Sequence, residues 1–178
     1  MLKRATLHEA QLKQAMIIAS DNPRMIYYSD GYWDYDLNLS ANNWDAQEFV
    51  SLDSSDNLLG FFCGVIERKA HYISSLSIIS FEDNPSWEFH KDFRDFILKL
   101  FVDYKYNKLK FHVSVGNPTE KLYDKFIKRF GGRIVGVFKD DCPLEDGTLV
   151  DRKDYEIFRD SFYEHANKYI ERYKKCQK

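Results

Sequence analysis

The sequence predicts an α/β (α+β) protein in which a mixed central sheet of about six to seven strands is flanked by helices, with an extra helix at the C-terminus. Three features support this prediction: short runs of alternating apolar and polar residues, longer stretches with apolar residues three or four positions apart, and Gly, Pro or Asn between them. Alternation is typical of strands, and the wider spacing is typical of helices. The 178 residues fit one domain, which we expect to span positions 1–178.

The first helix is predicted over residues 7–19. Thr6 and Glu9 have the spacing of a capping box, in which both side chains satisfy backbone N–H groups at a helix start. Pro23 ends this region, because proline cannot donate a backbone hydrogen bond. Residues 25–44 are rich in Tyr, Trp, Asp and Asn without a clear period, so no element is assigned to them.

Three strands follow in succession. Residues 48–52 and 58–67 are apolar runs separated by a polar turn, which predicts two neighbouring strands. Residues 72–81 predict a third strand, because Leu76 and Ile78 alternate with serines there.

The clearest helix is predicted over residues 89–104. Its apolar residues recur at steps of four, three and one, which is typical of a well-buried amphipathic helix: Phe89, Phe93, Phe96, Ile97, Leu100, Phe101 and Tyr104. The alternating stretch 109–115 predicts the next strand, and a strand that follows a helix in this way implies a crossover onto the same sheet.

A further helix is predicted to begin at Asn117, a favoured cap residue, with Pro118 at its first position. Gly131 and Gly132 end this helix, since glycine adopts positive φ at low cost. The remaining predicted elements are two strands over 134–138 and 150–158 and a terminal helix over 162–173.

Charge and cysteine content argue against several classes of protein. The 26 Lys and Arg residues are balanced by 28 Asp and Glu, which argues against nucleic acid as a partner. The three cysteines lie far apart without ligand spacing, so we expect neither disulfides nor a metal site. There is no signal peptide and no run of about 18 apolar residues, so we expect a cytoplasmic protein without membrane contact.

Several short motifs occur in order in the second half of the chain. They include Leu109-Lys110-Phe111-His112-Val113, Gly116-Asn117, Tyr123-Asp124-Lys125-Phe126, Asp146-Gly147 and Tyr155-Glu156-Ile157. From about residue 58 onward the chain resembles the GNAT superfamily of N-acetyltransferases, and most closely the branch that acetylates ribosomal proteins and other N-terminal amines. The resemblance implies an enzyme that transfers acetyl from acetyl-CoA to a primary amine of a small molecule or protein N-terminus, by direct attack.

The resemblance also implies where acetyl-CoA binds. In this family two successive parallel strands splay apart, here the strands over 72–81 and 109–115, and the pantetheine arm pairs with the free edge of the earlier one. The pyrophosphate lies at the start of the following helix, where free N–H groups favour anions. The implied cofactor-binding residues are Leu76, Ile78, Ser80, Trp87, His90, Lys91, Asp92 and Asn117.

The loop before that helix departs from the family pattern. Residues 82–92 contain no glycine and carry four acidic residues, whose charge opposes a diphosphate. This favours an alternative function, a catalytically inactive protein-binding module that keeps the GNAT fold and has lost CoA binding. In that case Trp87 or Phe89 would fill the groove.

The resemblance implies that Tyr123 is the catalytic acid, because family members often place at this helix position a tyrosine that protonates the departing thiolate. A phenol with a pKa of about 10 can give a proton to a thiolate within hydrogen-bond reach. Glu82 is the candidate general base, with Asp83, Glu67 and His71 as other candidates. Structural roles compete with these: Tyr123 also suits a helix core. The expected acceptor is a small-molecule or peptide amine, in a pocket shaped by Trp33, Asp34 and Tyr35. A homodimer through the terminal helix is a further expectation.

Overall fold

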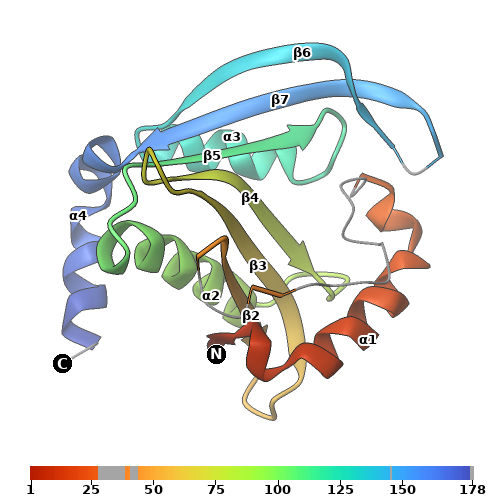
Figure 1. The fold of residues 1–178 in the computed structure, drawn as a ribbon, viewed down its shortest axis with the longest axis horizontal. Coiled ribbons are helices and arrows are strands. Elements are labelled where there is room, and N and C mark those ends of the chain that lie inside the picture. The colour runs from red at the N-terminus through yellow and green to blue at the C-terminus, as the bar shows by residue number, and fades with distance from the viewer. Residues whose placement is uncertain (28–38, 41–43, 145, 177–178) are drawn as a thin grey trace.

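The computed structural model describes residues 1–27, 39–40, 44–144 and 146–176, and their strands form one seven-stranded sheet (Figure 1). The strand order is β1-β2-β3-β4-β5-β7-β6, and only the β4–β5 pair is parallel among the described strands. This mixed sheet confirms the predicted architecture. The strands are β1 (Leu2–Arg4), β2 (Ala46–Leu52), β3 (Leu58–Glu67), β4 (Tyr72–Ser80), β5 (Lys108–Ser114), β6 (Arg133–Pro143) and β7 (Leu149–Phe158).

Four α-helices flank this sheet in the described residues, including the predicted C-terminal one. They are α1 (Glu9–Ser20), α2 (Trp87–Leu98), α3 (Glu120–Arg129) and α4 (Arg159–Cys176). Short helical turns are η1 (Ala5–Leu7), η2 (Pro23–Tyr27) and η3 (Lys99–Asp103), the last a π-helical continuation of α2. In the described part of the chain, no helix combines the length and the apolar character needed to cross a membrane.

The predicted capping box at the first helix is wrong. Thr6 lies inside η1, and α1 begins only at Glu9, after a His8 whose side chain makes no capping hydrogen bond. The preceding residues form the unpredicted strand β1, which pairs antiparallel with β2. Three residues are too few to show an alternating pattern, so this strand depends on its pairing partner and not on local sequence.

The C-terminal end of α3 follows the predicted chemistry, but the predicted start is wrong: α3 begins at Glu120 with Thr119 as its cap, and Asn117 and Pro118 precede the helix. Asn117 Oδ1 accepts hydrogen bonds from the Thr119 N–H (2.9 Å) and Oγ1 (2.8 Å), which forms the turn that leads into the helix. At the other end Gly131 has φ +69°, and the Gly132 N–H donates to the Ile127 carbonyl at 3.0 Å. This bonding pattern closes the helix as the two glycines predicted.

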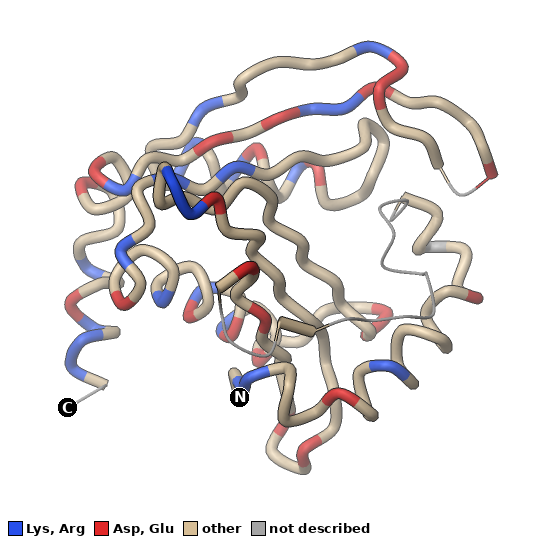
Figure 2. The backbone as a smooth tube through the Cα atoms, in the orientation of Figure 1, with Lys and Arg blue, Asp and Glu red and all other residues tan. Residues whose placement is uncertain are grey.

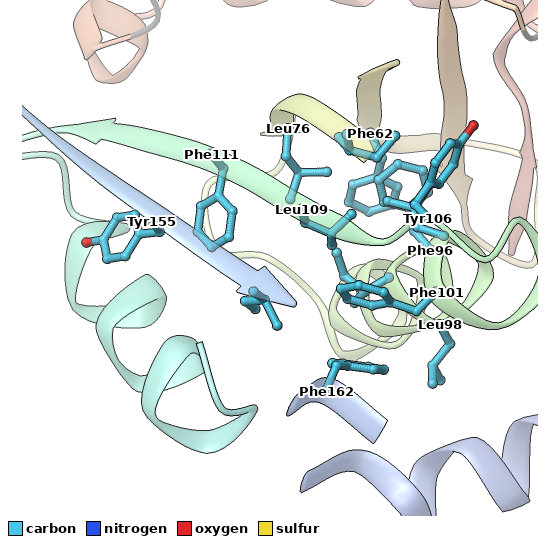
Figure 3. Close-up of a cluster of buried hydrophobic side chains, with 14 of the residues drawn as sticks. Phe62, Leu76, Phe96, Leu98, Phe101, Tyr106, Leu109, Phe111, Tyr155 and Phe162 are labelled. Atoms are coloured by element: carbon cyan, nitrogen blue, oxygen red, sulfur yellow. The ribbon is translucent and has the colours of Figure 1, made fainter. Parts of the chain in front are cut away.

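The sheet separates two apolar cores. One core joins α2, α3 and α4 to the sheet, and aromatic rings dominate it (Figure 3). Phe62 of β3 and Phe96 of α2 lie at its centre with ring centroids 5.5 Å apart. On the opposite face Leu12 and Met16 of α1 pack with Phe61 and other residues of β2–β4. Both faces of the central strands are thereby covered, and α2 is held firmly beside β4.

Strands β4 and β5 meet at only one register pair, Ile73 with Leu109. Beyond that pair the two strands diverge toward their C-terminal ends, which is visible in Figure 1. β5 instead pairs along its whole length with β7 on its other side. The predicted splay is therefore confirmed: β5 pairs with β4 at Ile73 and does not follow the rest of that strand.

Candidate functional site

A polar pocket of about 250 Å³ lies where β4 and β5 part. Side chains from three strands contribute to it, and its lining consists of Ser74, Ser75, Lys110, Phe111, His112, Arg152, Asp154 and Tyr155. The polar members of β5 alternate with Leu109, Phe111 and Val113, which face the helices α2 and α3. The pocket therefore opens on the face of the sheet opposite those helices.

β4 is irregular at the wall of this pocket. Its register with β3 shifts between the pairs Ile73–Ile66 and Ser75–Val65, so Ser74 is an extra residue in the strand. Such a bulge leaves backbone groups outside the regular ladder and turns them toward a neighbouring space. The pocket thus combines two serine hydroxyls with backbone groups of β4 that lie outside the regular β3–β4 hydrogen-bond pattern.

Charged groups line the side of the pocket formed by β5 and β7. Arg152 forms ion pairs with Asp154 (2.8 Å) and Asp141 (2.6 Å), and its hydrogen bond to Asp154 raises the pKa of the guanidinium. Lys110 and His112 come from β5, two residues apart on one face. None of these five residues was predicted to have a functional role, although the alternation of β5 placed Lys110 and His112 away from the core.

The start of α2 follows the C-terminal end of β4, where β4 and β5 lie apart. Ser86 caps the helix: its Oγ accepts the Phe89 N–H at 3.3 Å and its carbonyl accepts the His90 N–H at 3.1 Å. The N–H groups of Trp87 and Glu88 have no hydrogen-bond partner among the described residues. This helix start can therefore still bind an anion through two N–H groups.

Glu82 lies in the same loop, and its carboxylate already accepts two hydrogen bonds. Oε2 accepts the Ser86 N–H at 3.0 Å and the Ser86 hydroxyl at 2.8 Å. The loop contains no glycine and is closed by a side-chain carboxylate. This arrangement places a negative charge beside the helix start.

The other predicted residues of α2 differ in their surroundings. Trp87 is 70% exposed, and His90 is exposed with its ring edge toward Phe89. The Lys91 ammonium lies 2.9 Å from Asp95, and this hydrogen bond raises the pKa of Lys91. These side chains lie at or near the surface of the first turns of α2.

Asp92 faces the sheet and not the helix start. It is only 1% exposed, and its carboxylate accepts the Ser51 hydroxyl of β2 at 2.8 Å. This bond and an ion pair with the Met1 ammonium at 2.8 Å satisfy the buried charge and fix α2 on the sheet. We therefore leave the Asp92 side chain out of the proposed cofactor site.

The three predicted residues of β4 lie along the part of the strand that β5 does not reach. Leu76 is buried in the core shared with Phe111, and Figure 3 shows these two side chains on the helix side of the sheet. Ile78 and Ser80 are half-buried farther along the strand. All three thus lie beside the gap into which β5 does not reach.

Tyr123 of α3 is buried directly beneath the pocket. Its ring stands edge-on to Phe111 (centroids 5.2 Å apart) and to Tyr155 (6.0 Å), and both of these residues line the pocket. The core interpretation and the catalytic one are compatible, because packing would fix the ring in one orientation.

A group of charges holds α3 against β7 next to Tyr123. The Lys153 ammonium contacts Asp124 (2.7 Å) and Glu120 (3.2 Å), and the Tyr155 hydroxyl donates to Asp124 at 3.0 Å. The hydrogen bond from Lys153 lowers the pKa of Asp124, whereas burial and the bond to Asp124 raise the pKa of Tyr155. The ion pair therefore stabilises the fold above the ordinary pKa of an aspartate and is lost as the pH falls through the lowered value.

The remaining candidates lie elsewhere. Glu67 and His71 belong to the turn between β3 and β4, at the end of β4 opposite to α2. Asn117 uses its amide oxygen for Thr119, and its amide nitrogen donates to no described residue. Three predicted acceptor residues lie outside the described residues: Trp33, Asp34 and Tyr35.

Two further features of the described residues bear on candidate sites: a second cavity and the grouping of metal-ligating side chains. A second cavity, of about 220 Å³, is mainly apolar and lies between α2, α3 and α4. Phe93, Arg94, Ile97 and Leu98 of α2 line it, so it lies toward the end of that helix farthest from Ser86. Within the described ranges no three His, Cys, Asp or Glu side chains are grouped so as to hold a metal ion.

Comparison with known proteins decides the fold. No protein-family model and no curated protein matches the sequence. A spermidine N-acetyltransferase from Vibrio cholerae, solved in complex with CoA and spermine, matches with a TM-score of 0.70 over 91% of this chain and 96% of that chain, at 18% identity. The chain has the GNAT acetyltransferase fold.

Other solved structures agree on the GNAT fold. A Vibrio cholerae spermidine/spermine N-acetyltransferase with manganese ions matches with a TM-score of 0.58 and 21% identity, over 69% of this chain and 71% of that chain. A putative acetyltransferase matches with a TM-score of 0.52 and 15% identity, over 66% of this chain and 59% of that chain. The splayed strands and the pocket between them are therefore set in a fold that such enzymes use.

Proposed function

We propose that the chain is an N-acetyltransferase that uses acetyl-CoA to acetylate the amine of a small molecule. The observation that carries this proposal is the polar pocket at the point where β4 and β5 part, beside the edge of β4 that β5 does not reach. A protein of the same fold was solved with CoA and spermine, which supports both the cosubstrate and the acceptor class. A protein N-terminus is the second acceptor class, and the homodimer stays a prediction.

The residues along the gap suit a pantetheine arm. The backbone of β4 along this gap, on the edge that β5 does not reach, can bond to its amides as an added strand would. The Trp87 and Glu88 N–H groups would hold the pyrophosphate, and the free amide nitrogen of Asn117 lies at the end of β5. When bound, acetyl-CoA supplies an acetyl group activated as a thioester.

The side chains around the pocket can then move the protons that acetyl transfer requires. A protonated acceptor amine must lose a proton before it can attack, and we assign its acceptance to the imidazole of His112. Glu82 stays tied to Ser86, so we assign it to the loop and not to this step. Tyr123 would deliver a proton to the sulfur from below the pocket through its hydroxyl.

The charge of Glu82 gives a test of cosubstrate binding. Glu82→Gln keeps an oxygen that can accept from Ser86 but removes the negative charge near the pyrophosphate position. We expect the variant to bind acetyl-CoA about tenfold more tightly than the unaltered protein, with Kd measured by calorimetry. Binding of pantetheine, which lacks the pyrophosphate, should not change.

Glu171→Gln, an exposed residue of α4, is the matched control, because it removes the same charge far from the loop. An unchanged or weaker affinity of Glu82→Gln for acetyl-CoA would show that the pyrophosphate does not bind at this helix start. If neither the unaltered protein nor Glu82→Gln binds acetyl-CoA or pantetheine, the inactive binding module becomes the better account. The position of the Glu82 carboxylate is the observation that favours that alternative.

A further inference from the structure

Lys110 differs from the other cations that surround the pocket. Arg152 is neutralised by Asp154 and Asp141, and the nearby cations Lys108 and Arg133 share the buried carboxylate of Glu156. Lys110 has no ion pair or hydrogen bond of its side chain among the described residues, although it is half-buried and lines the pocket. The described part of the pocket therefore presents an unmatched positive charge.

This charge bears on the kind of amine that the pocket accepts. A second ammonium group on the acceptor would be repelled by Lys110, whereas a carboxylate would pair with it in a setting partly shielded from solvent. The hydroxyl of Ser75 adds a hydrogen-bond donor for the same anion, whereas the hydroxyl of Ser74 donates to the Val65 carbonyl at 3.3 Å. Charges of both signs are interspersed along β5, β7 and β6 in Figure 2, so the excess at Lys110 is local.

The spacing on β5 sets the length of the acceptor. Lys110 and His112 lie on the same face two residues apart, which corresponds to roughly 7 Å along the strand. An acceptor that offers an amine to His112 and an anion to Lys110 must separate the two groups by several bonds. A pocket of about 250 Å³ has room for such a molecule.

We propose that the acceptor is an amine that also carries a carboxylate or another anionic group, and that Lys110 binds this group. The inference that this amine is acetylated rests on the proposed function. The inference that Lys110 binds its anionic group does not. It assigns the chain a substrate class different from spermine, which is present in the similar structure from Vibrio cholerae.

Three amines of nearly equal length test the proposal: 5-aminopentanoate, 1,5-diaminopentane and pentylamine. With acetyl-CoA we expect kcat/KM for 5-aminopentanoate to exceed that for the diamine at least tenfold, with pentylamine between them. Lys110→Met should abolish this preference, and Lys110→Arg should retain it. Lys125→Met removes an exposed cation on α3 and is the matched control, with the preference unchanged.

A diamine that is used as well as 5-aminopentanoate, or a preference that survives in Lys110→Met, would overturn the proposal. If no amine is acetylated, the proposed function fails, and calorimetric binding of the same three amines decides the inference about Lys110. Binding of 5-aminopentanoate that is tighter than that of the diamine and is lost in Lys110→Met supports it. Equal binding, or none, contradicts it.

Discussion

Replacing Tyr123 with phenylalanine is expected to lower kcat by about 100- to 10,000-fold, the usual contribution of a positioned acid. The substitution removes only the hydroxyl, while the ring keeps its edge-on contacts with Phe111 and Tyr155. The melting temperature should therefore change by only a few degrees. Steady-state kinetics at saturating acetyl-CoA, together with thermal unfolding, would measure both quantities.

Tyr155→Phe is the matched control for this experiment. It removes a hydroxyl that donates to Asp124 at 3.0 Å, and it leaves the ring stacked on Phe111. We expect it to cost about 1 kcal/mol of stability and to leave kcat within a few-fold of the unaltered enzyme. If Tyr123→Phe instead retains full kcat, Tyr123 is a core aromatic and another group protonates the sulfur.

Phe96→Ala should lower the free energy of unfolding by about 3–5 kcal/mol, because it empties the centre of the larger core. Phe96 is 0% exposed, and its ring lies 5.5 Å from that of Phe62 and 5.7 Å from that of Phe49. These contacts join α2 to β2 and β3 and hold the helix start beside the gap. Denaturant unfolding followed by circular dichroism would measure the loss.

Trp87→Ala serves as the control on the same helix. The Trp87 side chain is 70% exposed, so its removal should change stability by no more than about 0.5 kcal/mol. A loss of less than about 1 kcal/mol for Phe96→Ala would show that the aromatic cluster does not hold α2 in place.

The sequence was sufficient to predict those elements that have a strong local pattern. The bounds predicted for β3 match the observed Leu58–Glu67, and Gly131 and Gly132 end α3 as expected. β1 was missed because three residues carry no period, and the capping box failed because η1 includes Thr6. In both cases pairing and burial outweighed local preference.

The site was harder to predict than the fold. The resemblance located the gap, but Lys110 and His112 were overlooked because polar residues of an alternating strand usually face solvent. The roles of Asp92 and Glu82 depend on contacts that a linear sequence does not reveal. Asp92 bonds to Ser51 on a distant strand, and Glu82 bonds to Ser86 across a turn. A local pattern identifies the face of an element but not the partner that comes to lie against it.

A crystal structure of the chain grown with acetyl-CoA would test most directly whether acetyl-CoA binds in the gap between β4 and β5. We expect the pantetheine arm between β4 and β5, bonded to the backbone of residues 76–80, with its pyrophosphate at the Trp87 and Glu88 N–H groups. Strands β4 and β5 hydrogen-bonded to each other past Ile73 and Leu109, or acetyl-CoA bound only outside this gap, would contradict the proposed function.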